Sequence, residues 1–261
     1  MTLLKHEFKQ GFKSLAVWTA AIGAFLAVCV FMYPEMENEM QDMSHMFSSM
    51  GAFTAAFGMD RLNFGELTGF YAIECGNILG LGGAFFSSLL AAGILSKEEK
   101  GRTAEFLLAH PIGRKKLLAE KLAAVFLQIA GLHLLAFALA AASIALIGQE
   151  IPVKEIGLLH LANFLAQLEL ACICFGVSAF LRRSGLGVGL GIAAVLYFLN
   201  ILSNITEQAK FLKYLTPFAY AEGADILADG RLDGEKILLG MGLSAVGVGA
   251  AFWKYCRKDI Q

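Results

Sequence analysis

Residues Leu122 to Ile147 read LAAVFLQIAGLHLLAFALAAASIALI, a run of 26 residues that contains no Asp, Glu, Lys or Arg. A helix of about 20 apolar residues is long enough to cross the roughly 30 Å hydrocarbon core of a bilayer. Within that core every backbone polar group needs a partner in the protein, and a continuous helix provides one. This run therefore predicts a membrane-spanning helix.

The composition of the whole chain agrees with that prediction. Of the 261 residues, 57% are hydrophobic and 16% are charged, whereas a soluble domain averages about 45–50% and 25%. These proportions exclude a simple soluble enzyme. The net charge of −1 carries no signature of nucleic-acid binding, and no nucleic-acid partner is expected.

Five further apolar runs approach or reach the same length. We expect six membrane-spanning helices, at Leu15–Met32, Tyr71–Leu95, Leu122–Ile147, Ile156–Phe180, Leu186–Leu202 and Ile237–Trp253. Six spans take up on the order of 120 positions, so each remaining tail or loop is smaller than an independent globular domain. The predicted fold class is an all-α membrane protein, organised as one transmembrane domain over residues 1–261.

The distribution of charge predicts the orientation of these spans. If the N-terminus is cytoplasmic, the inner tails and loops hold fifteen of the 21 Lys and Arg residues. Basic residues near span ends favour the cytoplasmic side, so we expect a multi-pass protein of the plasma membrane with both termini inside. The outer loops hold fourteen acidic residues against six basic ones. Ordinary solvation explains that excess, and a preference for cationic solutes is the alternative.

The segment between the second and third spans, SKEEKGRTAEFLLAHPIGRKKLLAEK from Ser96 to Lys121, has an unusual pattern. Thr103 is a suitable N-cap for a short helix that Pro111 ends. Such a helix exposes three apolar residues in succession, Phe106, Leu107 and Leu108. It is too short to be stable alone, so it must rest on the membrane surface or in a groove of a partner protein.

Two carboxylates lie within the apolar runs, where a charge is costly unless it is paired or hydrated. Glu169 is central in the fourth span and Glu74 is near the outer end of the second. For Glu169, a role in a substrate path and a structural hydrogen bond are the alternatives. His160, Asn163 and Gln167 recur at spacings of three and four, which places them on one helix face nearly opposite Glu169.

Small residues at four-residue spacing allow close approach of helix backbones in a membrane. Gly76 and Gly80 form one such pair in the second span, and Gly185 with Gly189 forms another in the fifth, next to Gly187 and Gly191. We interpret them as packing surfaces, either within the subunit or at a dimer interface.

Methionines recur with helical periodicity from Met32 to Met50. This spacing predicts that the first span continues outward as an amphipathic helix with a stripe of thioethers. Packing is the simpler interpretation. The alternative is a copper site, because thioethers and imidazole are ligands that suit Cu(I), and its candidate ligands are Met36, Met40, Met43 and His45.

The order of several short motifs resembles the six-span permease subunits of type-2 ABC exporters. The central motif has the pattern Glu99, Gly101, Thr103, Glu105, Leu107, Leu108 and Pro111, followed by the basic turn at 113–116. The resemblance includes an amphipathic N-terminal segment, the Arg182-Arg183 turn, the sequence LTPF at 215–218 and the basic C-terminal end. It extends over essentially the whole chain.

This resemblance implies a short amphipathic N-terminal helix, a cytoplasmic coupling helix between spans 2 and 3, and short re-entrant outer helices between spans 5 and 6. It implies that the coupling segment binds a separate ABC ATPase subunit. The residues implied in that contact are Glu98, Glu99, Gly101, Thr103, Glu105, Phe106, Leu107, Leu108 and Pro111.

No Gly-Lys dipeptide occurs in the chain, so a Walker A loop is absent from its sequence. We therefore expect no catalytic residue and no cofactor in this chain, with ATP and magnesium bound by the partner subunit. The expected assembly pairs this permease with a second one, the same or homologous, in the lipid bilayer. An ion-coupled secondary transporter or channel that uses Glu169, and a membrane scaffold for a partner complex, are the alternatives. The sequence leaves the substrate open.

Overall fold

The computed structural model describes residues 2–47, 51–100, 113–181 and 185–257. In these ranges all regular structure is helical, and six helical stretches are long and apolar enough to cross a membrane. The predicted fold class and number of spans are therefore confirmed. The long helices are α1 (Thr2–Phe47), α4 (Gly76–Gly93), α7 (Arg114–Leu146), α8 (Val153–Ser178), α9 (Leu186–Ile205) and α11 (Gly234–Arg257).

Shorter elements connect the long helices. The second span begins with α3 (Leu67–Phe70) and a π-helical turn, η1 (Tyr71–Cys75), which continue directly into α4. The others are α2 (Ala52–Ala56), α5 (Ser96–Lys100), η2 (Glu207–Tyr214), η3 (Pro217–Tyr220) and α10 (Gly223–Asp229). Three short helical elements thus follow the fifth span, where short helices were expected.

The first helix differs most from its predicted bounds. We expected a span at Leu15–Met32, and α1 is one helix from Thr2 to Phe47. The amphipathic N-terminal segment forms its first turns and is not a separate helix. At the other end, the methionine spacing correctly predicts that the helix continues beyond Met32.

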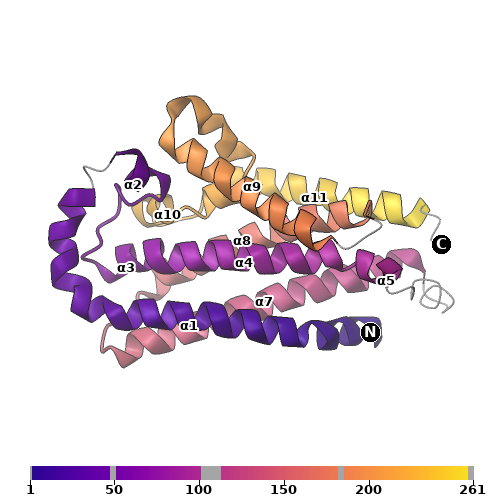
Figure 1. Ribbon diagram of the computed structural model, residues 1–261, viewed down its shortest axis with the longest axis horizontal. Helices are drawn as coiled ribbons and strands as arrows, with labels where there is room; N and C mark the ends of the chain where they lie inside the picture. Colours follow the sequence, from indigo (N-terminus) through magenta and orange to yellow (C-terminus); the bar gives the residue numbers. More distant parts are fainter. Residues whose placement is uncertain (1, 48–50, 101–112, 182–184, 258–261) are drawn as a thin grey trace.

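The long helices lie lengthwise beside one another (Figure 1). The first turns of α1, the last turns of α11 and helix α5 gather at one end of the bundle, which we call the α5 end. Helices α2 and α10 lie at the opposite end, the α10 end. Among the packed pairs are α1 with α7, α4 with α8, α8 with α11, and α4 with α9.

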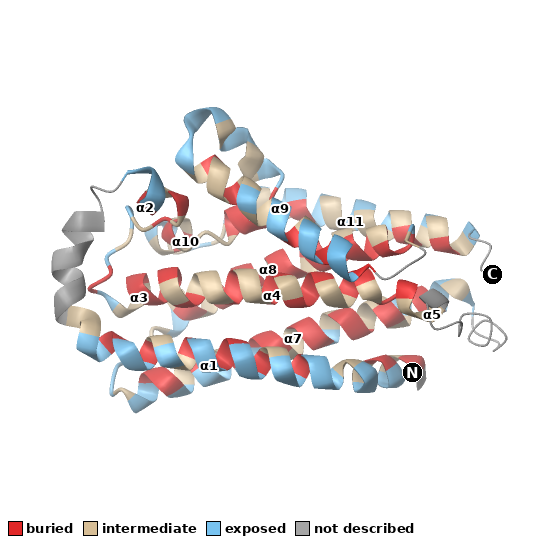
Figure 2. Ribbon diagram, viewed as in Figure 1, coloured by how far each residue is buried: buried red, intermediate tan, exposed pale blue. Residues whose placement is uncertain are grey.

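Burial is uneven across the bundle (Figure 2). In the apolar window of α8, 67% of the residues are buried, against 11% in α11. Many side chains on the open faces are large and apolar, for example Phe25, Leu134, Phe198 and Leu238. Exposed apolar surface of this extent is unusual for a soluble monomer, and it suits contact with lipid.

Candidate functional site

A buried cluster of charged side chains lies at the α5 end. The Lys121 side chain is 0% exposed and that of Glu7 is 1% exposed. Lys121 Nζ lies 2.6 Å from Glu7 Oε1 and 2.9 Å from Glu98 Oε1, and it donates to the Ile94 carbonyl at 3.1 Å. The ammonium group therefore has three acceptors, from α1, α5 and the turn that follows α4.

The second oxygen of Glu7 is also paired. Lys97 Nζ donates to Glu7 Oε2 and, at 2.8 Å, to Gln10 Oε1. Two carboxylates and two ammonium groups thus balance one another in the cluster of Glu7, Lys97, Glu98 and Lys121. Charges removed from water are tolerated only when they are paired in this way. We call these four residues the charge cluster.

Three members of the charge cluster, Lys97, Glu98 and Lys121, lie near the two ends of the predicted coupling segment. Helix α5 ends at Lys100, and α7 begins at Arg114. A further bond fixes the start of α7, because Arg114 Nη1 donates to the carbonyls of Tyr255 and Cys256 at 3.2 Å. Arg114 is thereby tied to the last turns of α11.

Most of the predicted coupling residues lie outside the described residues. These are Gly101, Thr103, Glu105, Phe106, Leu107, Leu108 and Pro111. Glu99 belongs to α5, but its side chain is not described either. Glu98 is the one predicted coupling residue with described side-chain contacts, and it belongs to the charge cluster.

Our reading of the sequence did not identify Glu7 as a functional candidate, although a signal was present. Glu7 is the only acidic residue before position 35. It is four residues from Leu3 and eight from Leu15, both of which are buried, so it lies on the inward face of α1. An acid on an apolar face predicts a buried cationic partner.

Glu169 is a residue of α8, and its side chain contacts η3 and α11. Its Oε2 atom accepts a hydrogen bond of 2.9 Å from the Tyr220 hydroxyl. The Glu169 carboxylate also packs against Gly240 of α11. A Cβ atom at position 240 would lie 2.1 Å from Glu169 Oε2, so only glycine leaves room for the carboxylate there. Glu74, the other intramembrane candidate, is half-buried in η1 and forms no ion pair within the described ranges.

The polar face of α8 points away from Glu169, as its spacing predicts. His160 Nε2 pairs with the Tyr71 hydroxyl at 2.7 Å, and Gln167 Oε1 pairs with His133 Nε2 at 2.9 Å. Gln167 also donates to the Leu79 carbonyl at 3.1 Å. These bonds connect α8 with η1, α7 and α4, so the face serves packing of the bundle core.

The predicted packing glycines differ in their surroundings. A Cβ at Gly189 would lie 2.7 Å from the Ser88 carbonyl oxygen, and one at Gly185 would lie 2.5 Å from the Ala92 carbonyl oxygen. A Cβ at Gly80 would lie 3.1 Å from Asn163 Oδ1. One at Gly76 would make only an ordinary contact, 3.9 Å from the Tyr71 carbonyl oxygen of the same span. Close approach of α4 and α9 therefore depends on Gly185 and Gly189.

The copper alternative falls mostly on side chains outside those that the structure describes. Met36 packs beside an apolar cluster that includes Tyr33 and Phe70. The side chains of Met40, Met43 and His45 lie outside those that the structure describes. Among the described residues, no group of three or more His, Cys, Asp or Glu side chains is placed to hold a metal ion.

The chain matches the model of a known protein family. The family described as ABC-2 family transporter protein matches residues 1–260. That range includes the charge cluster, Glu169 and all six spans. No curated protein matches the chain.

Proposed function

This chain belongs to the ABC-2 family of transporter proteins, and from that premise we propose that it is the permease of an ATP-driven exporter. In this proposal a separate ABC ATPase subunit binds ATP and magnesium, and the permease moves the substrate. The proposed complex contains a second permease, the same or homologous. No residue of this chain takes part in covalent chemistry.

The observation that carries the proposal is the family match over essentially the whole chain. The charge cluster supports the mechanical part. Because Lys121 joins α7 to Glu7 of α1 and Glu98 of α5, a pull on residues 101–112 would act on three helices together. ATPase closure then shifts the bundle between two packings, which requires only that nucleotide favours one of them.

The proposed orientation places the α5 end in the cytoplasm and both termini on that side of the plasma membrane. The excess of basic residues in the corresponding tails and loops supports this orientation. The weakly buried helices α9 and α11 leave apolar faces for lipid or for a second permease.

Copurification and one charge reversal test the proposal. We expect the full chain to copurify with an ABC ATPase, and Glu105→Lys to uncouple ATP hydrolysis from transport. The control is Glu207→Lys, the same substitution at an 80% exposed side chain of η2, which should leave coupling unchanged. Transport that follows an ion gradient without any ATPase would favour a secondary transporter.

A photocrosslinker at Phe106 tests the contact itself. In the complete working assembly, we expect crosslinks to the ATPase subunit. Crosslinks that reach only phospholipid would contradict the coupling proposal, since the segment would then rest on the membrane surface.

A further inference from the structure

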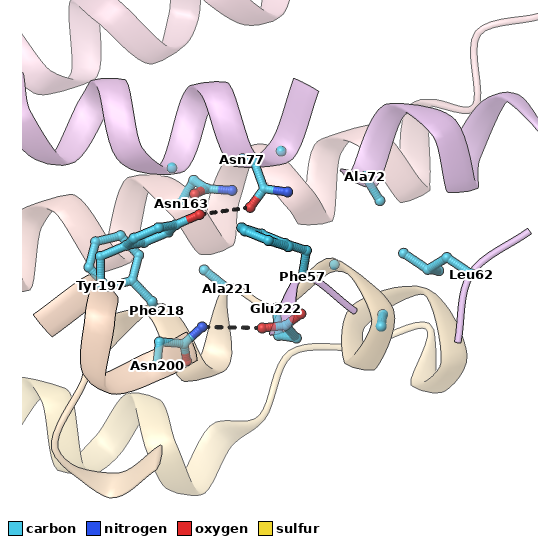
Figure 3. Close-up of a pocket in the computed structure, with 14 residues that line it drawn as sticks. Phe57, Leu62, Ala72, Asn77, Asn163, Tyr197, Asn200, Phe218, Ala221 and Glu222 are labelled. Carbon is cyan, nitrogen blue, oxygen red and sulfur yellow. Dashed lines mark hydrogen bonds between the residues drawn. The ribbon is translucent and has the colours of Figure 1, made fainter. Parts of the chain in front are cut away.

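A small polar cavity lies toward the α10 end, where α4, α8, α9 and η3 meet (Figure 3). Its volume is about 40 Å³. The ring of Phe57, from the loop that follows α2, lies between the Asn77 and Glu222 sides of this space. A water molecule needs roughly 10–15 Å³ of such space, so the cavity fits a small polar group and is too small for a whole drug-sized solute.

The amide and hydroxyl groups on one side of the cavity are partly hydrogen-bonded within the protein. Tyr197 donates to Asn77 Oδ1 at 3.2 Å, and Asn77 donates to the Ile73 carbonyl at 2.7 Å. Asn163 donates to the Leu159 carbonyl at 2.9 Å. The Tyr197 hydroxyl oxygen and the two amide oxygens can accept further bonds, and each amide keeps one N–H.

Glu222 supplies a carboxylate on the other side. Its side chain is 10% exposed, and its Oε2 atom accepts from Asn200 Nδ2 at 3.3 Å and Asn204 Nδ2 at 3.0 Å. The Oδ1 atom of Asn200, which lines the cavity, is buried and has no hydrogen-bond partner among the described residues. This side thus adds one free amide oxygen and one negative charge.

The nearest cation neutralises Glu222 only in part. Arg61 Nη2 lies 4.0 Å from Glu222 Oε1, while Arg61 Nη1 is hydrogen-bonded to Asp225. Asp225 is therefore the main partner of the guanidinium group. A second cation in the cavity would approach Glu222 without breaking the bond between Arg61 and Asp225.

One carboxylate, the free amide oxygen of Asn200 and aromatic walls match a cation that donates hydrogen bonds. Rings such as those of Phe57, Tyr197 and Phe218 also attract cations through their faces. Calcium takes six to eight oxygen ligands, usually with several carboxylates, and this lining offers only one. We propose that the cavity binds a primary ammonium group, which extends the proposed export function by assigning amines as a substrate class.

A binding experiment on the full-length chain in nanodiscs tests this proposal. Butylammonium chloride is titrated by calorimetry, with butanol as the neutral probe of the same size and sodium chloride as the simple cation. We expect saturable binding of butylammonium alone. Glu222→Gln keeps the shape of the side chain and removes its charge, and it should weaken binding roughly tenfold or more.

Two further variants test the proposal even if the Glu222→Gln protein does not fold. Arg61→Gln removes the competing cation and should strengthen binding, whereas Tyr197→Phe removes one acceptor and should weaken it by a smaller factor. Glu207→Gln is the control, because Glu207 is exposed and does not line this cavity. Opposite effects of Glu222→Gln and Arg61→Gln would not arise from a general loss of structure.

Equal binding of butanol or sodium would overturn the assignment, as would the absence of butylammonium binding to the wild-type chain. The measurement needs neither ATP nor the ATPase subunit. Failure to bind the amine therefore leaves the exporter proposal standing, and failure to copurify with an ATPase leaves the cavity proposal standing.

Discussion

The ammonium group of Lys121 lies 2.6 Å from Glu7 Oε1, with both side chains removed from solvent. The two residues are 114 positions apart, and their bond fixes the first turns of α1 against α7. Because Glu98 shares the same ammonium group, the ends of the helices on both sides of residues 101–112 meet at a single cation.

Removal of that cation should be strongly destabilising. We expect Lys121→Met to lower the free energy of unfolding by about 3–5 kcal/mol, since it leaves buried carboxylates without their main partner. Lys210→Met is the control, because Lys210 and its partner Glu207 are 59% and 80% exposed and an exposed pair contributes about 1 kcal/mol or less. Denaturant unfolding in detergent measures both.

A double substitution separates charge from packing. Replacing a buried ion pair by apolar residues is often neutral, whereas removing one partner is costly. We therefore expect Glu7→Met to restore part of the stability that Lys121→Met loses. If the double variant instead loses the sum of the stabilities that the two single variants lose, the Glu7–Lys121 ion pair does not cause the loss in Lys121→Met.

Glycines on opposite faces of α9 form a matched pair. Gly189→Ala places a Cβ 2.7 Å from the Ser88 carbonyl oxygen, so α4 and α9 must separate, and we expect a loss of about 1–3 kcal/mol. A Cβ at Gly187 meets nothing within 4 Å. Gly187→Ala should be neutral or slightly stabilising in the same thermal unfolding assay, and a loss as large as that of Gly189→Ala would contradict this packing.

The sequence predicts the spans well because composition and length determine them. Periodicity also places His160 and Glu169 on opposite faces of α8, since each residue of a helix turns by a fixed angle. It does not identify Tyr220 as the partner of Glu169, because that contact depends on how η3 packs against the bundle. For the same reason the sequence does not identify Lys121 as the partner of Glu7. That contact depends on which face of α1 packs against α7.

The bond between Tyr220 and Glu169 should be structural. Tyr220→Phe leaves a buried carboxyl group without its donor, and we expect a loss of about 1–3 kcal/mol. Glu169→Gln should cost less, because its amide oxygen can still accept from Tyr220, and transport should be unchanged. Unfolding in detergent and ATP-dependent transport in vesicles are the two measurements. A Gln variant that is stable but inactive would place Glu169 in the substrate path.

The start of α11 should respond to acid through Asp233. Its Oδ1 atom accepts from the backbone amides of Glu235 at 3.1 Å and Lys236 at 3.3 Å, and Lys236 Nζ lies 2.9 Å from its Oδ2 atom. The bond from Lys236, followed by those from the backbone, lowers the pKa of Asp233 below its usual value. The stabilisation is therefore complete above the pKa of an unfolded aspartate, about 3.9, and is lost as the pH falls through the lower folded value.

Amide hydrogen exchange in the first turn of α11 measures this effect, with each variant compared with the wild type at the same pH. Asp233→Ala removes the cap and should cost about 1 kcal/mol near neutral pH. Asp233→Asn keeps a good capping side chain and removes the titrating group, so its exchange should approach that of the wild type as the pH falls below 4. If the wild type exchanges more slowly than Asp233→Asn by the same factor at every pH, the carboxylate charge is not the cause.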